Sequence, residues 1–427
     1  MASTVSDRPG YGQLLRTPGA WTFLLPGFAA RQPFAMLTIG IVLLVQHTTG
    51  SYGSAGSVAA VTGVSMALFA PQTGKLADRF GQRAVLLPGL LVHAVSVSAL
   101  TALALADSPL WALFVAAVPT GASVPQIGPM VRARWAAVLG AAPGREASPL
   151  MPTAAAFESV TDEFTFVIGP VVATALCTGV HPAAGLITEA GLTLVGGLLF
   201  AAQSRTQPAV STPATSASRR HASALSVPGV RVLAVTFLGI GAVFGGMQVS
   251  LTAFAEEVGR PGANGLLYGV FAAGNMLAGI ACGAIAWKSG PRRRLIVGYT
   301  ALTLTASGLW AVHSMTLLAG LGLLVGLSIA PALISGYTLV EGLVPESART
   351  EAFTWLTGSV ALGQAGAVTI AGRLADAHGA STGFVVPLVG TVLALATLLA
   401  LRSRLVPAAS SRAVARGVGH REPVTVD

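Results

Sequence analysis

The ten residues GKLADRFGQR, from Gly74 to Arg83, follow a long apolar run and gather charge in a chain that carries little of it. Lys75, Arg79 and Arg83 surround Asp78, whereas only 10% of all residues are charged. Two glycines flank the aspartate, as is typical of a tight turn. We therefore predict that this segment is a short basic turn between two apolar helices.

The composition indicates that most of the chain lies in lipid. Of 427 residues, 53% are hydrophobic, and the mean hydropathy is +0.72. Soluble domains carry about 25% charged residues, and a soluble core could not cover so much apolar surface. A helix needs roughly 20 apolar residues to cross a bilayer. Twelve such stretches are centred near residues 33, 64, 95, 121, 165, 193, 242, 275, 303, 328, 361 and 392.

The basic residues follow the topology of these spans. With a cytoplasmic N-terminus, every Lys and Arg faces the cytoplasm except Arg31, Arg260 and Arg373, which is the positive-inside pattern. It predicts a multi-pass protein of the bacterial inner (plasma) membrane with both termini cytoplasmic, and no cleaved signal peptide is expected. The net charge of +9 does not indicate a nucleic-acid partner, because no aromatic residues are interleaved with the cations.

The chain divides into two halves of six spans each. Residues 203–226 are rich in Ser, Thr, Ala and Pro and indicate a flexible linker. In the second half, GAIAWKSGPR at 283–292 repeats the glycine and basic positions of the first loop, with Trp287 in place of Asp78. Paired halves of this kind are common in secondary transporters. The predicted segments are a cytoplasmic N-terminal segment (1–19), a six-helix bundle (20–203), a cytoplasmic linker (204–228), a second six-helix bundle (229–404) and a cytoplasmic tail (405–427).

These features resemble the major facilitator superfamily, whose signature loop between the second and third helices reads G-x-L-a-D-r-x-G-r-r. The resemblance covers almost the whole chain and implies an all-α integral membrane fold of twelve helices around a central cavity that opens alternately to either side. It also implies that Gly74, Asp78, Arg79, Gly81 and Arg83 hold the cytoplasmic end closed against the eleventh helix in the outward-facing state. Gly74 is expected to permit close approach of a neighbouring helix. The alternative is that the loop only turns tightly and follows the charge rule.

Charged residues within the spans mark a candidate coupling site, since a charge at the bilayer centre costs at least about 2.5–3.5 kcal/mol. Arg31 lies near the middle of the first span, and Glu158, Asp162 and Glu163 lie in the fifth. Glu158 and Asp162 are four residues apart and share a helix face. We expect Arg31 to pair with Asp162 or Glu163. An acid left without a cation favours its protonated form and is a candidate proton carrier; the alternative is a static buried ion pair.

Gly169 and Pro170 carry a second, partial resemblance. They are similar to the G-P-x-x-G element in the fifth helix of drug:proton antiporters, although an alanine occupies the last glycine position. This resemblance implies export. The arginine that such antiporters carry within the fourth helix is missing, because Arg132 and Arg134 lie only at the cytoplasmic end of the fourth span. Arg31 is the candidate substitute.

Further polar residues within the spans are candidates for lining a substrate cavity, although each is also typical of an interhelical hydrogen bond. They are Gln32, Gln126, Gln248, Asn275, Tyr337, Trp355 and Gln364. His93 is expected to be a packed, neutral histidine, and Glu189 is expected near the outer surface. GRLADAHG, at 372–379, is similar in sequence to the signature loop. The topology places it on the outer side of the membrane, where we expect a hydrophilic turn.

The sequence favours a transporter over an enzyme. It holds no P-loop for ATP and no cysteine–histidine cluster with zinc spacing, so we expect no cofactor and no metal site. The prediction is a monomeric secondary transporter that exports a small, partly hydrophobic organic compound in exchange for protons. One alternative is a proton-coupled uptake symporter for a small polar nutrient. The other is a non-transporting membrane sensor, in which the buried charges have no coupling role.

Overall fold

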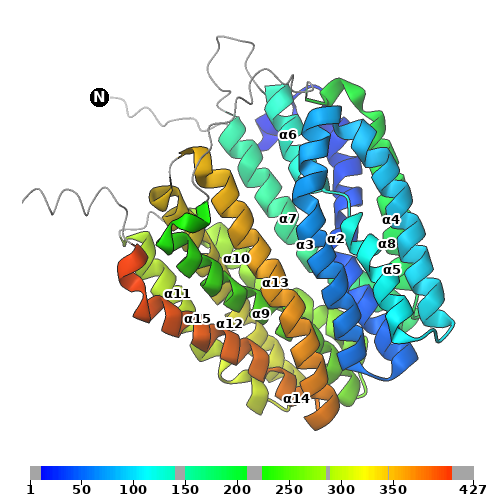
Figure 1. The fold of residues 1–427 in the computed structure, drawn as a ribbon, viewed down its shortest axis with the longest axis vertical. Coiled ribbons are helices and arrows are strands. Elements are labelled where there is room, and N and C mark those ends of the chain that lie inside the picture. Colours follow the sequence, from blue (N-terminus) through cyan, green and yellow to red (C-terminus); the bar gives the residue numbers. More distant parts are fainter. Residues whose placement is uncertain (1–10, 140–149, 209–223, 285–288, 345, 406–427) are drawn as a thin grey trace, which may run out of the picture.

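The computed structural model describes residues 11–139, 150–208, 224–284, 289–344 and 346–405 (Figure 1). The predicted N-terminal segment, linker and C-terminal tail fall partly outside these ranges. Within the ranges, the side chains of Asp78 and Glu163 are among those not described. All regular elements in the described ranges are helices, so the all-α prediction is confirmed.

The helices of the two halves follow each other along the chain. The first half contains α1 (Tyr11–Leu15), α2 (Ala20–Thr49), α3 (Tyr52–Phe80), α4 (Gln82–Leu105), α5 (Leu110–Ala122), α6 (Ile127–Leu139), α7 (Met151–Gly179) and α8 (Ala184–Ala202). The second contains α9 (Pro228–Glu257), α10 (Ala263–Ala284), α11 (Pro291–Ala306), α12 (Met315–Leu343), α13 (Glu346–His378), α14 (Ala380–Gly383) and α15 (Val385–Ala400).

Ten candidate membrane spans are found among the described residues, by helix length and composition. The helix α11 has 16 residues, fewer than the roughly 20 that cross a bilayer, and neither α11 nor α13 is among the ten. The count of twelve therefore stays a prediction. The predicted fourth span is one candidate span from Leu110 to Leu139, but it is interrupted between α5 and α6, around Pro125.

Glycines let helices within one bundle pack backbone against backbone. A Cβ atom at Gly241 of α9 would overlap the carbonyl oxygen of Val360 in α13. A Cβ atom at Gly363 would likewise overlap the carbonyl oxygen of Leu238. Small residues are how transmembrane helices achieve such packing, because lipid supplies no hydrophobic drive between them. The α9–α13 contact thus depends on these two positions.

The two bundles meet chiefly through the pairs α3–α13 and α7–α10. We call the end of the molecule that carries Gly81 and Gln203 the linker end, and the end that carries Ser51 and Gly379 the far end. A Cβ atom at Gly56, near the far end of α3, would lie 2.5 Å from the carbonyl oxygen of Val368 in α13.

Along α3 this contact loosens toward the linker end. At Gly63 the nearest atom is the Cβ of Ala365, 3.9 Å away, and at Gly74 no heavy atom of the described residues lies within 4 Å. Figure 1 shows the same divergence of α3 and α13. No described residue makes the close approach expected at Gly74, which stays a prediction, and the bundles touch at the far end.

A buried hydrogen-bonded pair lies inside the first bundle. The Nε2 atom of His93 in α4 is 2.8 Å from the Oε1 atom of Glu189 in α8, and the side chains are 0% and 1% exposed. The Nδ1 atom of His93 lies 3.2 Å from the carbonyl oxygen of Thr120. Glu189 lies near the start of α8 and is buried, because α8 packs inside the bundle and directs the acid to His93 on a neighbouring helix.

The close packing of α9 on α13 generates a stability prediction. Gly241→Ala should lower the melting temperature of the detergent-purified protein by at least a few degrees, since overpacking costs about 1–3 kcal/mol. The matched control is Gly366→Ala, because a Cβ atom there meets no described atom within 4 Å. Thermal melting followed by tryptophan fluorescence compares the two variants, and equal melting temperatures would contradict the packing argument.

Candidate functional site

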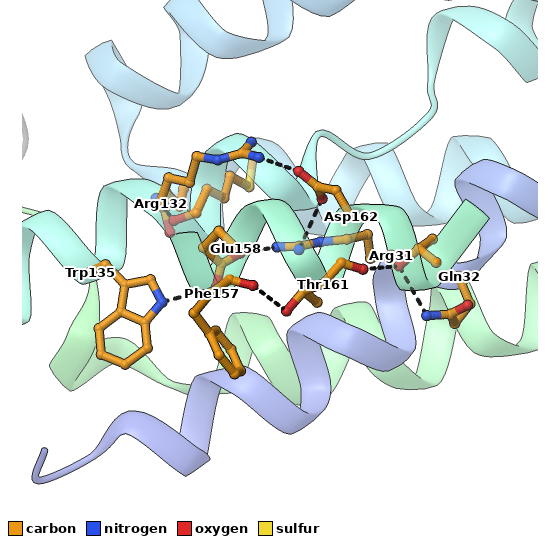
Figure 2. A network of polar contacts seen from close by, with 11 residues as sticks. Arg31, Gln32, Arg132, Trp135, Phe157, Glu158, Thr161 and Asp162 are labelled. Atoms are coloured by element: carbon orange, nitrogen blue, oxygen red, sulfur yellow. Dashed lines mark hydrogen bonds and ion pairs between the residues drawn. The ribbon is translucent and has the colours of Figure 1, made fainter. Parts of the chain in front are cut away.

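Arg31 of α2 lies between two carboxylates of α7, as Figure 2 shows. Its Nη2 atom is 2.6 Å from the Oε2 atom of Glu158, and its Nη1 atom is 3.0 Å from the Oδ1 atom of Asp162. Arg31 and Glu158 are 6% and 1% exposed, whereas Asp162 is 29% exposed. The predicted pairing of Arg31 with Asp162 is thus present, and Glu158 is a second, deeper partner.

Two residues of α6 complete this charged network. Arg132 forms an ion pair with the Oδ2 atom of Asp162, and the indole nitrogen of Trp135 donates a hydrogen bond of 2.9 Å to the Oε1 atom of Glu158. Two guanidinium groups therefore face two carboxylates, and the buried charges of Arg31 and Glu158 compensate each other. Arg132 is not among the site residues expected from the sequence, and the packing of α6 against α7 brings it to Asp162.

Small residues set the positions of the helices that carry the network. A Cβ atom at Gly169 would lie 2.6 Å from the Cβ atom of Ala35, so α7 approaches α2 closely about two turns beyond Asp162. The Nε2 atom of Gln32 donates to the hydroxyl of Thr165 at 3.1 Å and ties the same two helices. A Cβ atom at Gly128 would lie 3.6–3.8 Å from Arg132, Asp162 and Arg31, so this glycine lies directly beside the charges.

An apolar pocket of about 280 Å³ adjoins the ion pair. Arg31, Glu158 and Thr161 supply its polar groups. Its other lining residues come from α2, α6 and α7 and are hydrophobic or aromatic: Trp21, Leu24, Leu25, Phe28, Val131, Phe157, Val160 and Phe164. The pocket can therefore accept an apolar group while a polar group of the same molecule contacts the charges.

The other candidate cavity residues are distributed over the fold. Gln364 and Gln248 bond to each other across α13 and α9 at 3.5 Å, and the amide of Gln126 donates to the carbonyl oxygen of Val124 at the α5–α6 interruption. Asn275 is buried in α10, and Trp355 is 43% exposed on α13. These side chains lie outside α2, α6 and α7, the helices of the Arg31 network, and their contact with a substrate stays a prediction.

Tyr337 belongs to an aromatic cluster of the second bundle. Its ring packs edge-on against Phe237 and Phe353, and its hydroxyl lies 3.1 Å from the Oγ1 atom of Thr357. Its predicted role in lining a substrate cavity is not tested by these contacts.

The signature loop is the turn between α3 and α4. Gly81 has φ 89°, a backbone conformation that L side chains avoid, so the predicted tight turn at this glycine is confirmed. Arg79 and Arg83 are exposed at the linker end, and the Arg79 guanidinium lies 5.1 Å from the ring centroid of Phe80. The expected contact of Asp78 with the eleventh helix lies outside the described side chains.

Arg134, the other cation of α6, is a packing residue. It is 0% exposed, and its guanidinium stacks 3.6 Å from the ring centroid of Phe200 in α8. Its Nε atom donates to the side-chain oxygen of Gln82 at 2.9 Å, and its Nη1 atom donates to the carbonyl oxygen of Gln203 at 3.0 Å. This residue joins α4, α6 and α8 at the linker end, away from the Arg31 network.

Comparisons with known proteins agree with this architecture. Residues 24–312 and 261–425 match the family model described as Major Facilitator Superfamily. No curated protein matches the sequence closely enough to count as a relative.

Solved structures of low sequence identity share the fold. A mutant of the nucleoside transporter NupG has a TM-score of 0.69 at 13% identity, with 90% of this chain and 99% of that chain covered. An auto-inhibited POT family peptide transporter has a TM-score of 0.65 at 12% identity, covering 90% and 96%. A bacterial homologue of the iron transporter ferroportin, in an inward-facing state, has a TM-score of 0.65 at 16% identity, covering 90% and 99%. Because the family match extends over most of the sequence and the fold agrees with it, the protein belongs to the major facilitator superfamily of membrane transporters.

Proposed function

We propose that the protein is a secondary active transporter that exports a small, partly hydrophobic organic compound in exchange for protons, by alternating access. It acts as a monomer in the plasma membrane, with the linker end at the cytoplasm, as the distribution of Lys and Arg favours. The observation that carries this proposal is Arg31, held between Glu158 and Asp162 beside an apolar pocket.

Asp162 is the proton carrier in this proposal. It is 29% exposed, whereas Glu158 is 1% exposed and bonded to both Arg31 and Trp135, so Asp162 is the more accessible acid. The carrier is thus an acid paired with two cations, rather than the acid without a cation expected from the sequence. Protonation of Asp162 would weaken its attraction to Arg31 and Arg132 and free both guanidinium groups. A change in the charge of this site would thus alter the packing of α2, α6 and α7, which is the coupling that an exchanger requires.

The lining of the pocket favours a partly hydrophobic cargo over a polar nutrient. Four of its residues are aromatic, namely Trp21, Phe28, Phe157 and Phe164, and only three are polar. A sugar or similar nutrient needs several hydrogen-bonding groups around it, because buried polar groups without partners are costly. The uptake symporter remains the second candidate function, since Gln248, Gln364 and Asn275 supply amides in the other bundle.

A two-stage experiment tests direction and cargo. Cells that lack their main exporters are grown with and without the gene against a panel of amphipathic antibiotics and metabolites. An exporter raises tolerance to at least one compound class. Everted membrane vesicles, acidified inside by respiration, should then accumulate that compound, and an uncoupler should abolish the accumulation. Accumulation only in right-side-out vesicles with an acidic exterior would favour the uptake symporter, and no flux in either orientation would favour the sensor.

The Arg31–Glu158 pair should be needed for transport beyond its role in folding. Arg31→Met alone should reduce the yield of folded protein, because it leaves Glu158 buried without its cation, at a cost of about 3–5 kcal/mol. The double variant Arg31→Met/Glu158→Met should restore yield but not transport in everted vesicles. The matched control is His93→Leu/Glu189→Leu, which removes an equally buried pair away from the pocket and should leave transport per folded molecule unchanged. Transport by the Arg31/Glu158 double variant would show that the pair is only structural.

Asp162→Asn should leave substrate exchange intact but abolish its dependence on the proton gradient. The amide keeps the size and one hydrogen-bond acceptor of the carboxylate but cannot carry a proton. Exchange of labelled for unlabelled substrate should persist in proteoliposomes, while accumulation driven by a pH gradient falls at least about tenfold. Glu163→Gln is measured alongside. Normal gradient-driven export by both single variants would exclude both acids as the coupling carboxylate.

A further inference from the structure

At the far end, a carboxylate of one bundle binds the start of a helix in the other. The Oδ2 atom of Asp376, in α13, accepts hydrogen bonds of 2.7 Å from the hydroxyl of Ser51 and from the backbone N–H of Gly53. Its Oδ1 atom accepts one of 2.8 Å from the backbone N–H of Tyr52. The first turn of a helix has N–H groups without intrahelical partners and a positive dipole end. Asp376 accepts bonds from two of these N–H groups and places its negative charge at the positive end of the α3 dipole.

A second carboxylate of the second bundle, that of Glu256, binds residues of the first bundle beside the start of α3. The Oε1 atom of Glu256, in α9, accepts a hydrogen bond of 3.1 Å from the amide of Gln46, and its Oε2 atom accepts one from the hydroxyl of Tyr52. All donors therefore belong to the first bundle and all acceptors to the second. We call these contacts of Asp376 and Glu256 the far-end gate.

Asp376 lies in a segment that repeats the signature loop. GRLADAHG, at 372–379, and GKLADRFG, at 74–81, share the pattern G-basic-L-A-D-x-x-G. Both end a long helix, and both close on a glycine with nearly the same backbone: φ 89° and ψ 148° at Gly81, and φ 90° and ψ 163° at Gly379. The expected hydrophilic turn is thus a helix end with a turn geometry matching that of the signature loop.

The two segments stand at opposite ends of one pair of helices. The helices α3 and α13 pack against each other across the two bundles and run in opposite directions (Figure 1). GKLADRFG ends α3 at the linker end, and GRLADAHG ends α13 at the far end. Each aspartate is therefore placed near the C-terminal end of its own helix, and Asp376 lies beside the N-terminal end of α3.

We propose that Asp376 is a gating residue that holds the far end closed, and that GRLADAHG is the far-end counterpart of the signature loop. The far end cannot open while α3 is capped from the opposite bundle, so each transport cycle breaks and remakes these bonds. The structure represents the closed far end: α3 contacts α13 at Gly56 but meets no described atom within 4 Å at Gly74. This inference rests on the proposed alternating access.

Distance measurements between spin labels test the gate without a known substrate. Labels are placed at Ser108→Cys and His313→Cys, in far-end connections of the first and second bundle, after Cys177→Ala and Cys282→Ser remove the native thiols. A second label pair, at Ala137 and Arg293, reports the linker end. The wild-type protein in lipid nanodiscs should show mainly the short far-end distance.

Asp376→Asn should raise the ratio of long to short far-end distances by about tenfold, since it removes the charge and one acceptor oxygen. Ser51→Ala, which acts from the other bundle, should shift the ratio in the same direction by less. The matched control is Glu257→Gln. Glu257 accepts a bond from the backbone N–H of Ala380 within its own bundle, so its loss should leave the ratio unchanged.

The outcomes separate the gate from the transport cycle. If the linker-end pair shows two distances while Asp376→Asn leaves the far-end ratio as in the wild type, the gate is wrong and alternating access stands. If both label pairs give one distance in every variant, the gate and the proposed function both fail. A shift equal to that of Asp376→Asn in the Glu257→Gln control would also overturn the gate, because any far-end carboxylate would then have the same effect.

Discussion

The need to pair charge inside a hydrocarbon environment governs the first bundle. Arg31 is 6% exposed and contacts two acids of α7; without them its burial would cost several kcal/mol. The pairing in turn requires that α2 and α7 lie close, and Gly169 permits this because a side chain there would overlap Ala35. Arg31, its two acids and Gly169 therefore form one unit: the glycine lets the helices approach, and the approach lets the charges pair.

In the proposed function, the same unit links the binding of a proton to a change of conformation. Asp162 is shared by Arg31 and Arg132, so its charge affects α2, α6 and α7 together. The interruption between α5 and α6 places Arg132 and Trp135 on a separate helical segment. Interrupted helices are common at the binding sites of secondary transporters, where free backbone groups and movable segments are useful. In the proposed function, the apolar pocket beside the pair is where a cargo would meet these charges.

The interface between the bundles is built on a different principle. There, α3 and α13 touch through glycines at the far end, and the closing contacts are carboxylates on a helix N-terminus and on polar side chains. Such bonds are strong enough to favour one state yet reversible, because water can replace each partner once the helices separate. Hydrophobic packing of equal area would hold the bundles more permanently.

The sequence by itself determined the membrane character, the all-α fold, the tight turn at Gly81 and the pairing of Arg31 with Asp162. These follow from composition, from charge asymmetry and from the cost of an unpaired charge in lipid, all of which are local or additive properties. Tertiary structure alone decided that Arg132 and Trp135 join the site, that Glu189 is buried against His93, and that Asp376 caps α3. Each of these contacts joins residues far apart along the chain, or across the interrupted fourth span. Their partners depend on how helices rotate and pack, which no pattern along the sequence specifies.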